Sequence, residues 1–318
     1  MTLKINGLNI GPGEKVYSTI KTGEASTHEI RMPYVVVNGD KDGKTLCVLG
    51  GIHPLEYASI IGVQRIAQII TPEKLKGRLL LIPVVNTDGF NARAAFNNPI
   101  DYVNQNRVFP GSSEGTMSRR VAHILYKEFV SKADALVDCH GGDLTEDIVQ
   151  YVITGKTLDD NIKQQMLDMA ACFDSFFTLE SEIMGSTGEA LQKYGIPCIT
   201  PESGTPYPIR ERDIKFHYDG VINVLKYMGM LEGEPQLKNL PLNPKQEKIY
   251  AHHGGLWLQK VEAGQRVKKD QELGRVVNLY GETIQNVVAP FDGLANSTRT
   301  SAVTNTGDAL VSVYDAQF

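Results

Sequence analysis

The sequence predicts an α/β fold with a small all-β domain at its C-terminal end. Up to about residue 230, apolar runs of strand length alternate with segments of helical period. Beyond residue 252 the helical period is lost, and short β-rich runs are separated by glycines. Strands that alternate with helices favour a sheet covered on both faces, and ligands bind at the carboxyl ends of its strands. We therefore expect the functional residues to follow the predicted strands.

The predicted elements follow from the spacing of apolar residues and from the residues that stop each segment. Apolar residues recur every three or four positions in the helical segments, and the first of these stops at Thr71-Pro72. Strands are predicted at 46–52, 78–85, 136–139, 148–154 and 196–200, and helices at 56–70, 117–130, 158–173, 185–194 and 218–230. The segment 231–244 has the composition of a linker. It divides the chain into an α/β domain, residues 1–235, and a β domain, residues 245–318.

Composition and charge narrow the class of protein. The chain has 318 residues, of which 42% are hydrophobic and 22% charged, and its formal net charge is −5. Without a long basic run, neither nucleic acid nor a membrane surface is an expected partner. The longest apolar run, 79–85, is too short to span a bilayer, and the N-terminus lacks the pattern of a signal peptide. We therefore expect a cytoplasmic protein.

The four cysteines indicate the same compartment. Cys47, Cys139, Cys172 and Cys198 form no CxxC pair and lie in apolar segments. They are interpreted as reduced core thiols of a cytosolic protein. The alternative for Cys139 is a metal ligand, but the alternation of a strand directs its side chain away from that of His140.

Two histidines and a glutamate are the most informative residues of the chain. His53 and Glu56 lie three positions apart, directly after an apolar run that ends in two glycines, and His140 follows a second apolar run. A single histidine is more often structural, but two imidazoles and one carboxylate form the ligand set of a catalytic zinc site with a fourth position left for water. We predict one Zn²⁺ per chain, held by His53, Glu56 and His140. The choice of zinc rests on the ligand types.

Four further polar residues are candidates for the chemistry around this metal. Asp138 lies two positions before His140, on the same side of the strand, where it either orients an imidazole or caps a loop. Glu202 follows another apolar run and is the candidate general base, although it is one glutamate among many. Asn106 and Arg107 stand together in a loop and could grip a substrate carboxylate. The alternative for Arg107 is a surface ion pair.

Other motif-like segments are interpreted as structural. Residues 39–45 resemble a phosphate-binding loop, but the segment is one residue short and a strand follows it. Residues 111–115 have the letters of a nucleophile elbow but do not follow a strand. The pair His252-His253 is interpreted as part of a loop. The charged runs 210–213 and 268–270 are interpreted as solvated faces.

Four blocks in order together resemble the succinylglutamate desuccinylase/aspartoacylase family, which belongs to the wider zinc carboxypeptidase-like group. They begin at Gly50, Asn106, Asp138 and Pro201, and the resemblance extends over nearly the whole chain. It implies a mixed α/β sheet of the phosphorylase/hydrolase type. It also implies a reaction that removes an acyl group from the nitrogen of an amino acid.

The resemblance assigns roles to residues of this sequence. It implies that His53, Glu56 and His140 bind zinc, that Glu202 is the catalytic glutamate, and that Asn106 and Arg107 bind the substrate carboxylate. Arg107 would also help to stabilise the oxyanion.

The sequence departs from the family pattern in one region. Family members often read Asp-Leu-Asn-Arg where this chain has Asn104-Gln-Asn-Arg, and a further arginine often precedes that block by about ten residues. Arg93 is the nearest candidate for that arginine. The substrate therefore stays open among an acyl-diaminobutyrate, another small acylated amino acid and an amidated metabolite.

The C-terminal domain resembles a lipoyl/biotinyl-type barrel-sandwich. No lysine stands at the hairpin tip where a prosthetic group would be attached. We expect a structural module that narrows the mouth of the active site or mediates formation of a homo-oligomer.

The sequence thus predicts a zinc-dependent amidohydrolase that acts on a small N-acyl amino acid, with Glu202 as general base. Two rival functions remain. One is a carboxypeptidase on the same scaffold, which releases C-terminal amino acids from peptides. The other is a metal-bearing binding or scaffolding protein. The acyl group, the amino acid and the oligomeric state are not given by the sequence.

Overall fold

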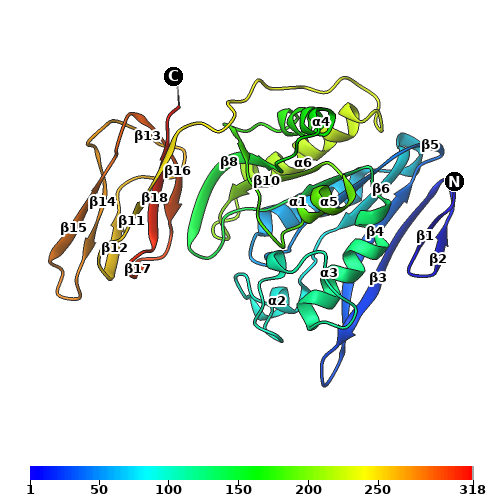
Figure 1. The fold of residues 1–318 in the computed structure, drawn as a ribbon, viewed down its shortest axis with the longest axis horizontal. Coiled ribbons are helices and arrows are strands. Elements are labelled where there is room, and N and C mark those ends of the chain that lie inside the picture. Colours follow the sequence, from blue (N-terminus) through cyan, green and yellow to red (C-terminus); the bar gives the residue numbers. More distant parts are fainter. Residues whose placement is uncertain (317–318) are drawn as a thin grey trace.

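A mixed β-sheet runs through most of the molecule (Figure 1). The computed structural model describes residues 1–316. Within these residues the sheet has 12 strands, and its main path runs β11-β18-β16-β8-β10-β7-β5-β6-β4-β3. These strands are β3 (Glu14–Glu24), β4 (Glu29–Asn38), β5 (Lys41–Leu49), β6 (Lys76–Ile82), β7 (Ala135–Asp138), β8 (Glu146–Thr154), β10 (Cys198–Gly204), β11 (Gln246–Tyr250), β16 (Gly293–Arg299) and β18 (Ala309–Tyr314). Two short strands, β9 (Thr178–Glu180) and β13 (Arg266–Val267), pair with β8 and β16.

The centre of the sheet is parallel and its flanks are antiparallel. Strands β6, β5, β7 and β10 run parallel to one another, whereas β4 and β8 pair antiparallel to the outermost of them. The sheet is therefore mixed, as expected from the family resemblance. The carboxyl ends of β5, β7 and β10 lie at one edge, because parallel strands end together.

Helices cover both faces of the central strands, as the alternation of segments predicts. Side chains of these strands alternate between two hydrophobic clusters: Val48 belongs to one and Leu49 to the other. Helices α1 (Tyr57–Ile69), α4 (Asp160–Ala171) and α6 (Glu211–Tyr227) contribute to the first cluster. Helices α3 (Met117–Glu128) and α5 (Glu189–Tyr194) contribute to the second. A further short helix, α2 (Thr87–Ala92), follows β6.

Several predicted elements differ from the structure at their ends. Helix α5 begins at Glu189 rather than at the predicted residue 185. Gly185 has a positive φ of 73°, which is incompatible with a right-handed helix at that position. Helix α6 begins at Glu211, earlier than the predicted start at residue 218. The prediction missed the first turn because that turn is charged and lacks the apolar period. Strand β10 continues to Gly204, so that Glu202 lies inside the strand and not after it.

The N-terminal region was not predicted correctly. Instead of alternating strands and helices, it forms the hairpin of β1 (Leu3–Ile5) and β2 (Leu8–Ile10), followed by the antiparallel strands β3 and β4. Most side chains of β3 are at least partly exposed, so the apolar alternation that marks a strand is weak there.

The charged run 210–213 is a solvated face only in part, because Glu211 and Arg212 are exposed but Asp213 is buried. Arg210 makes ion pairs with Asp147 of β8 and with Asp213, and Asp213 is buried. Asp213 also accepts hydrogen bonds from Gln150 and from Ser203 of β10. These contacts tie the start of α6 to β8 and to β10, the strand that carries Glu202.

The C-terminal part is all β, as predicted. Strands β12 (Gly255–Gln259), β14 (Glu272–Val277), β15 (Thr283–Val288) and β17 (Val303–Thr304) form a separate four-stranded sheet in the order β15-β14-β12-β17. They share a core with β16 and β18 that includes Trp257 and Leu273. The hairpin tip between β14 and β15 exposes Leu279 and Tyr280.

The C-terminal strands join the main sheet. Strand β16 pairs with the start of β8, where Ser297 faces Ile148 and Arg299 faces Glu146. In Figure 1 the orange and red strands accordingly lie at one end of the molecule, and the blue N-terminal strands lie at the other. The boundaries of the two domains, 1–235 and 245–318, stay a prediction, because one sheet runs across both.

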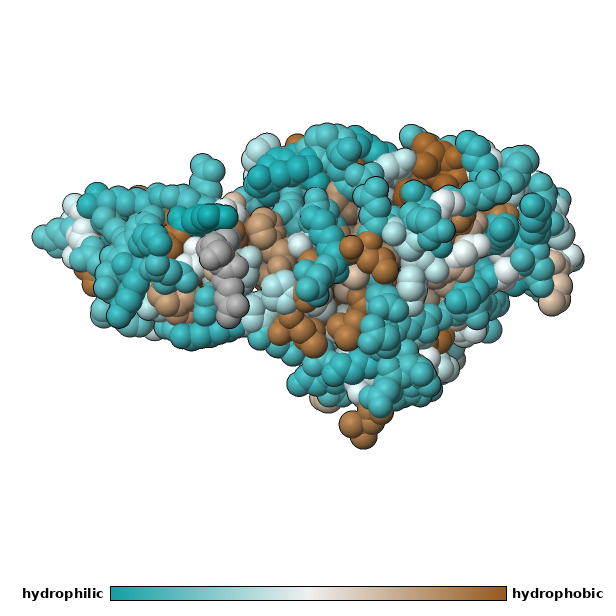
Figure 2. All heavy atoms as spheres, turned by 90° about the horizontal axis from the view of Figure 1, so that it is seen from above, coloured by the Kyte–Doolittle hydropathy of each residue, from teal (hydrophilic) through white to brown (hydrophobic). Residues whose placement is uncertain are grey.

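Two predictions from composition concern the interior and the surface. The four cysteines are buried free thiols, and Cys139 packs in the hydrophobic core with Val137. No helix within residues 1–316 combines the length and apolar character needed to cross a membrane. On the face drawn in Figure 2, apolar residues form small groups among hydrophilic ones.

Candidate metal and active site

The turn after β5 brings His53 and Glu56 to the edge where the parallel strands end. The backbone of Gly51 has a φ of 62°, and a Cβ atom there would lie 3.1 Å from Cα of Val84. A glycine is therefore required for the chain to turn this closely past the end of β6. Glu56 then stands at the N-cap of α1, but its side chain makes no cap hydrogen bond. The carboxylate is free to face the histidines.

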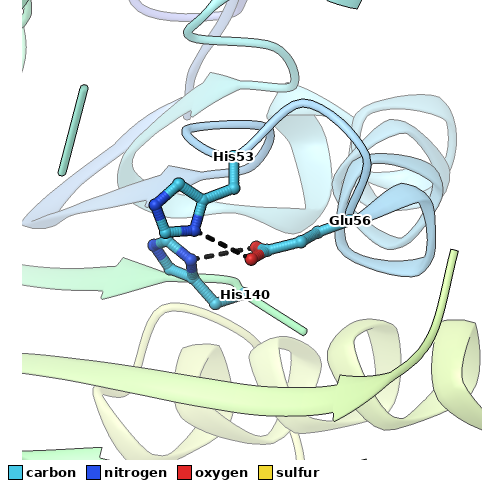
Figure 3. Close-up of side chains that lie close together, drawn as sticks. All are labelled: His53, Glu56 and His140. Atoms are coloured by element: carbon cyan, nitrogen blue, oxygen red, sulfur yellow. Dashed lines mark hydrogen bonds and ion pairs between the residues drawn. The ribbon is translucent and has the colours of Figure 1, made fainter. Parts of the chain in front are cut away.

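Three predicted ligands converge at this edge (Figure 3). Nδ1 of His53 lies 2.9 Å from Oε1 of Glu56, and Nδ1 of His140 lies 2.9 Å from Oε2 of Glu56. The potential ligand atoms all lie within 4.8 Å of one another, and the three side chains are buried. The structure thus brings together the residues that the sequence analysis selected.

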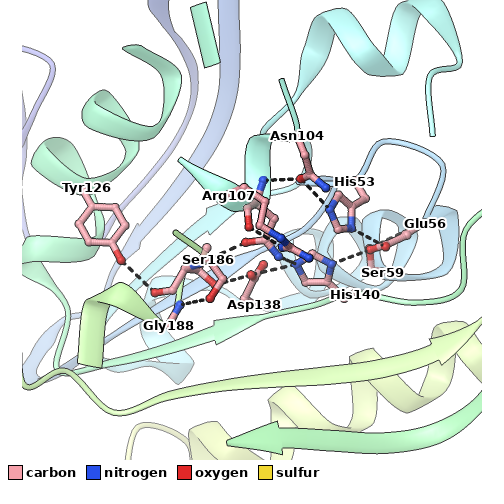
Figure 4. Close-up of polar contacts among 12 residues, drawn as sticks. His53, Glu56, Ser59, Asn104, Arg107, Tyr126, Asp138, His140, Ser186 and Gly188 are labelled. Carbon is pink, nitrogen blue, oxygen red and sulfur yellow. Dashed lines mark hydrogen bonds and ion pairs between the residues drawn. The ribbon is translucent and has the colours of Figure 1, made fainter. Parts of the chain in front are cut away.

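Each of these two histidines has a hydrogen-bond partner on Nε2, the ring nitrogen that does not contact Glu56 and is called the outer nitrogen below (Figure 4). Nε2 of His140 lies 3.0 Å from Oδ2 of Asp138, and Nε2 of His53 lies 3.2 Å from Oδ1 of Asn104. A metal-binding imidazole usually donates its other N–H to an oxygen acceptor, which fixes the ring and leaves the inner nitrogen for the metal. Of the two alternatives left open for Asp138, this contact matches the one in which it orients an imidazole. Asn104 belongs to the loop block quoted above, but its contact with His53 was not predicted.

The residues fit a divalent metal ion. Oε2 of Glu56 is buried and accepts no hydrogen bond, although Nδ1 of His140 lies 2.9 Å away. A buried carboxylate oxygen without a donor is costly unless a cation is near it. Two imidazole nitrogens and a carboxylate around one point also match the ligand preference of zinc and related metals.

The charges at the site perturb one another strongly. Burial alone would raise the pKa of Glu56, but the facing His140 and His53 outweigh it and hold the pKa at about 2. Burial would lower the pKa of His140, whereas the carboxylates of Asp138 and Glu56 raise it well above its usual range. The carboxylates therefore favour a positive charge at this point, which a bound metal ion would supply.

Glu202 lies beside this cluster on β10. A parallel bridge joins the backbones of His140 and Glu202, in which the N–H of His140 donates to the carbonyl oxygen of Pro201 at 2.9 Å. Burial raises the pKa of Glu202 well above its usual range; the nearby His140 opposes the shift, and Glu56 adds to it. Glu202 as a whole residue is half-buried.

A small cavity adjoins Glu202. Its volume is about 70 Å³, which is room for a few water molecules or a short acyl chain. Asn106 and Glu202 line it together with the segment 181–189 and part of β8.

The predicted substrate-binding pair lies on a short 3₁₀ turn, Gln105–Arg107. Asn106 is buried, and its Nδ2 atom lies 3.5 Å from Nε2 of His140. Arg107 is exposed, and its Nη1 donates to the carbonyl oxygen of Asn106 at 2.6 Å. The side chain of Asn106 thus lies next to His140. The side chain of Arg107 is exposed and can contact a bound substrate.

Arg93 is placed differently from the other candidates. It ends α2 in a left-handed conformation and is exposed. Its charge acts on Tyr57, whose pKa is raised to about 12, chiefly by burial and by the contact with Tyr207. The centroids of the Tyr57 and Tyr207 rings are 5.8 Å apart. Arg93 therefore belongs to an aromatic group beside α1 rather than to the His53–Glu56–His140 cluster.

Thr187 is a further residue that sequence reasoning missed. Its hydroxyl donates to Oδ2 of Asp138 at 2.5 Å, and its backbone N–H donates to Oδ1 of Asn106 at 3.2 Å. It stands in the loop before α5, where no sequence motif marks it.

Comparison with known proteins agrees with the fold. Residues 42–228 match the family model of the succinylglutamate desuccinylase/aspartoacylase catalytic domain. A curated relative, the N-alpha-acetyl-L-2,4-diaminobutyric acid deacetylase of Halomonas elongata, is 26% identical over 303 residues, which cover 92% of this chain and 87% of that protein.

Two solved structures have the same fold. The product-bound ectoine utilization protein EutE (DoeB) of Ruegeria pomeroyi superposes with a TM-score of 0.86 at 25% identity, over 95% of each chain. A succinylglutamate desuccinylase from Silicibacter sp. TM1040 superposes with a TM-score of 0.83 at 24% identity, also over 95% of each chain.

Proposed function

Because the chain belongs to the succinylglutamate desuccinylase/aspartoacylase family, we propose that it is a zinc-dependent hydrolase of the amide bond in a small N-acyl amino acid. The observation that carries this proposal is the convergence of His53, Glu56 and His140 beside Glu202. The curated relative is named for a reaction of this kind, the deacetylation of an N-acetylated amino acid. That name supports the reaction class.

The metal would be held by Nδ1 of His53, Nδ1 of His140 and the carboxylate of Glu56. When bound, zinc supplies Lewis acidity at the acyl carbonyl and lowers the pKa of water. Asp138 and Asn104 hold the two imidazole rings in place through their outer nitrogens.

Glu202 is the proposed general base and acid. A carboxylate with an ordinary pKa is a weak base, and the raised pKa of Glu202 brings it closer to the pH at which an enzyme works. It would take a proton from the attacking water on its carboxylate oxygen and pass that proton to the leaving nitrogen.

Asn106 and Arg107 are the proposed contacts for the substrate carboxylate. The guanidinium presents several N–H donors in a plane that matches a carboxylate, and one of them already bonds to the loop and orients the group. Arg107 would also stabilise the negative charge that develops on the acyl oxygen. Arg93 would meet the substrate further out, next to Tyr57.

A panel of substrates tests this proposal. The zinc-loaded protein is incubated with N-acetyl and N-succinyl amino acids of different side-chain charge and with N-blocked dipeptides, and the products are identified by mass spectrometry. We expect a free carboxylic acid to be released from at least one N-acyl amino acid, and this release to disappear in Glu202→Gln.

Two other outcomes would reject the proposal. Release of C-terminal amino acids from the dipeptides alone would identify a carboxypeptidase. No turnover of any compound by a zinc-saturated protein would favour a binding or scaffolding protein.

A further inference from the structure

We propose that Thr187 is a positioning residue, which orients the metal ligand His140 by fixing the carboxylate of Asp138. The inference rests on the proposed function only in taking His53, Glu56 and His140 as metal ligands. It does not depend on which substrate is cleaved.

Two donors meet on one oxygen of Asp138. The hydroxyl of Thr187 donates to Oδ2 at 2.5 Å, and Nε2 of His140 lies 3.0 Å from the same atom. The other oxygen, Oδ1, is buried and accepts no hydrogen bond. Among the described residues, Thr187 and His140 are the donors that orient the carboxylate. Since His140 is the group to be oriented, Thr187 is the residue that holds Asp138 still.

Thr187 is itself held firmly. It is 1% exposed, its carbonyl oxygen accepts a hydrogen bond from the hydroxyl of Tyr126 at 2.9 Å, and its backbone N–H donates to Asn106 (Figure 4 labels Tyr126 and Asp138). The carbonyl also accepts a hydrogen bond from the N–H of Ala190, in the first turn of α5. With its backbone fixed on both sides, the hydroxyl has little freedom to leave Asp138.

The fixed carboxylate decides which nitrogen of His140 faces the metal. A carboxylate that accepts from Nε2–H leaves Nδ1 as the ligand atom, on the side of Glu56. Without the hydroxyl, Oδ2 would keep only the imidazole as a donor, and the buried carboxylate could turn. The ring would be held less well, and the metal would bind more weakly.

The backbone and the hydroxyl of Thr187 act on different partners. The N–H orients the side chain of Asn106, a proposed substrate contact, whereas the hydroxyl donates to Asp138 and also contacts the buried thiol of Cys198. Thr187→Val removes the hydroxyl, keeps the shape of the side chain and leaves the backbone N–H in place. The substitution therefore separates metal binding from substrate binding.

The experiment compares Thr187→Val, Thr187→Ser and Thr22→Val with the full-length wild type. Thr22 is the matched control, a buried threonine whose hydroxyl donates to the backbone of Ile30 in the β3–β4 pair. Zinc affinity is measured by competition with a chromophoric chelator. We expect Thr187→Val to bind zinc about 10- to 100-fold more weakly. Thr187→Ser should retain most of the affinity, and Thr22→Val should match the wild type.

A second readout follows the histidine directly. In ¹⁵N NMR of the zinc-loaded wild type, Nε2 of His140 should carry a proton that exchanges slowly with solvent, and this exchange should be faster in Thr187→Val. A metal bound at Nε2 in the wild type would overturn the proposal, even if the valine variant failed to fold. Equal zinc affinities of Thr187→Val and wild type would overturn it, as would equal losses in the valine and serine variants.

These readouts are independent of catalysis. Loss of zinc affinity in Thr187→Val alone would support the inference even if no N-acyl amino acid were cleaved. Normal deacylation with unchanged zinc affinity in that variant would reject the inference and leave the proposed function intact.

Discussion

Oδ1 of Asn104 lies 3.2 Å from Nε2 of His53 and also accepts the backbone N–H of Asn106 at 2.8 Å. One amide oxygen therefore joins a metal ligand to the loop that carries the proposed substrate contacts. Asp138 has the corresponding place behind His140.

Removal of the Asn104 side chain should disturb both partners. We expect Asn104→Ala to lower zinc affinity about 10- to 100-fold, the usual cost of losing such a partner of a ligating histidine. KM should rise as well, since the 105–107 turn loses the hydrogen bond at its start. Asn104→Asp keeps the acceptor and should retain most of the zinc affinity. Chelator competition and steady-state kinetics measure the two effects, and an alanine variant with wild-type values would contradict this role.

Replacement of Glu202 by glutamine should remove catalysis and spare the metal. The amide keeps the shape of the side chain but cannot take a proton, so kcat should fall by about 10²- to 10⁴-fold. Zinc content should stay at the wild-type level, because Glu202 is not among the three ligands. Glu180→Gln, which changes an exposed ion pair with Lys163, is the matched control. A Glu202→Gln enzyme with near-normal kcat at full zinc occupancy would exclude Glu202 as the base.

Zinc binding should become weaker as the pH falls. The pKa of His140 is raised well above its usual range in the metal-free protein, whereas Glu56, with a pKa of about 2, stays ionised. Zinc must then displace the proton of His140, and its affinity should fall about tenfold for each unit that the pH drops below that pKa. Titrations in buffers of different ionisation enthalpy would detect the released proton. Zinc affinity independent of pH between 6 and 8 would show that His140 is neutral there.

His217 should make the fold less stable in acid. It is buried on α6 with no hydrogen bond to either ring nitrogen. Burial lowers its pKa from 6.5 to about 4, against the opposing charge of Asp213. At a pH between these two pKa values, the imidazole is protonated in the unfolded chain but not in the folded one. The free energy of unfolding therefore falls as the pH drops from 6.5 to about 4, by about 3 kcal/mol in all.

The variant His217→Leu removes this titration without removing a hydrogen bond. Urea unfolding of the metal-free protein at pH 7.5 and at pH 4.5 should show a smaller loss of stability for the variant than for the wild type. Parallel losses in the two proteins would assign the acid sensitivity to other groups.

The sequence located the three residues proposed as metal ligands because each follows a strand end, and strand ends are visible as apolar runs that stop at glycines. The partners of those ligands were harder to find. Asp138 ends β7 two positions before His140, so alternation was enough to find it. Asn104 and Thr187 reach the site through loops, which have no periodic pattern in the sequence. The first turn of α6 was also not predicted, because tertiary contacts stabilise it: Arg210, at its start, makes ion pairs with Asp147 and Asp213. The pairing of β8 with β16 joins segments about 150 residues apart, and no local pattern encodes it.

The junction between β8 and β16 also protects an edge. An unpaired strand edge is a template for aggregation, and β16 covers the start of β8 from Glu146 to Ile148. The apolar side chains of Val149, Phe177, Leu294 and Tyr314 are buried together at the same junction. A chain cut at the linker would expose both the strand edge and this apolar surface. The C-terminal strands thus protect the α/β part, residues 1–235, against self-association. We expect this part to aggregate when it is produced without them.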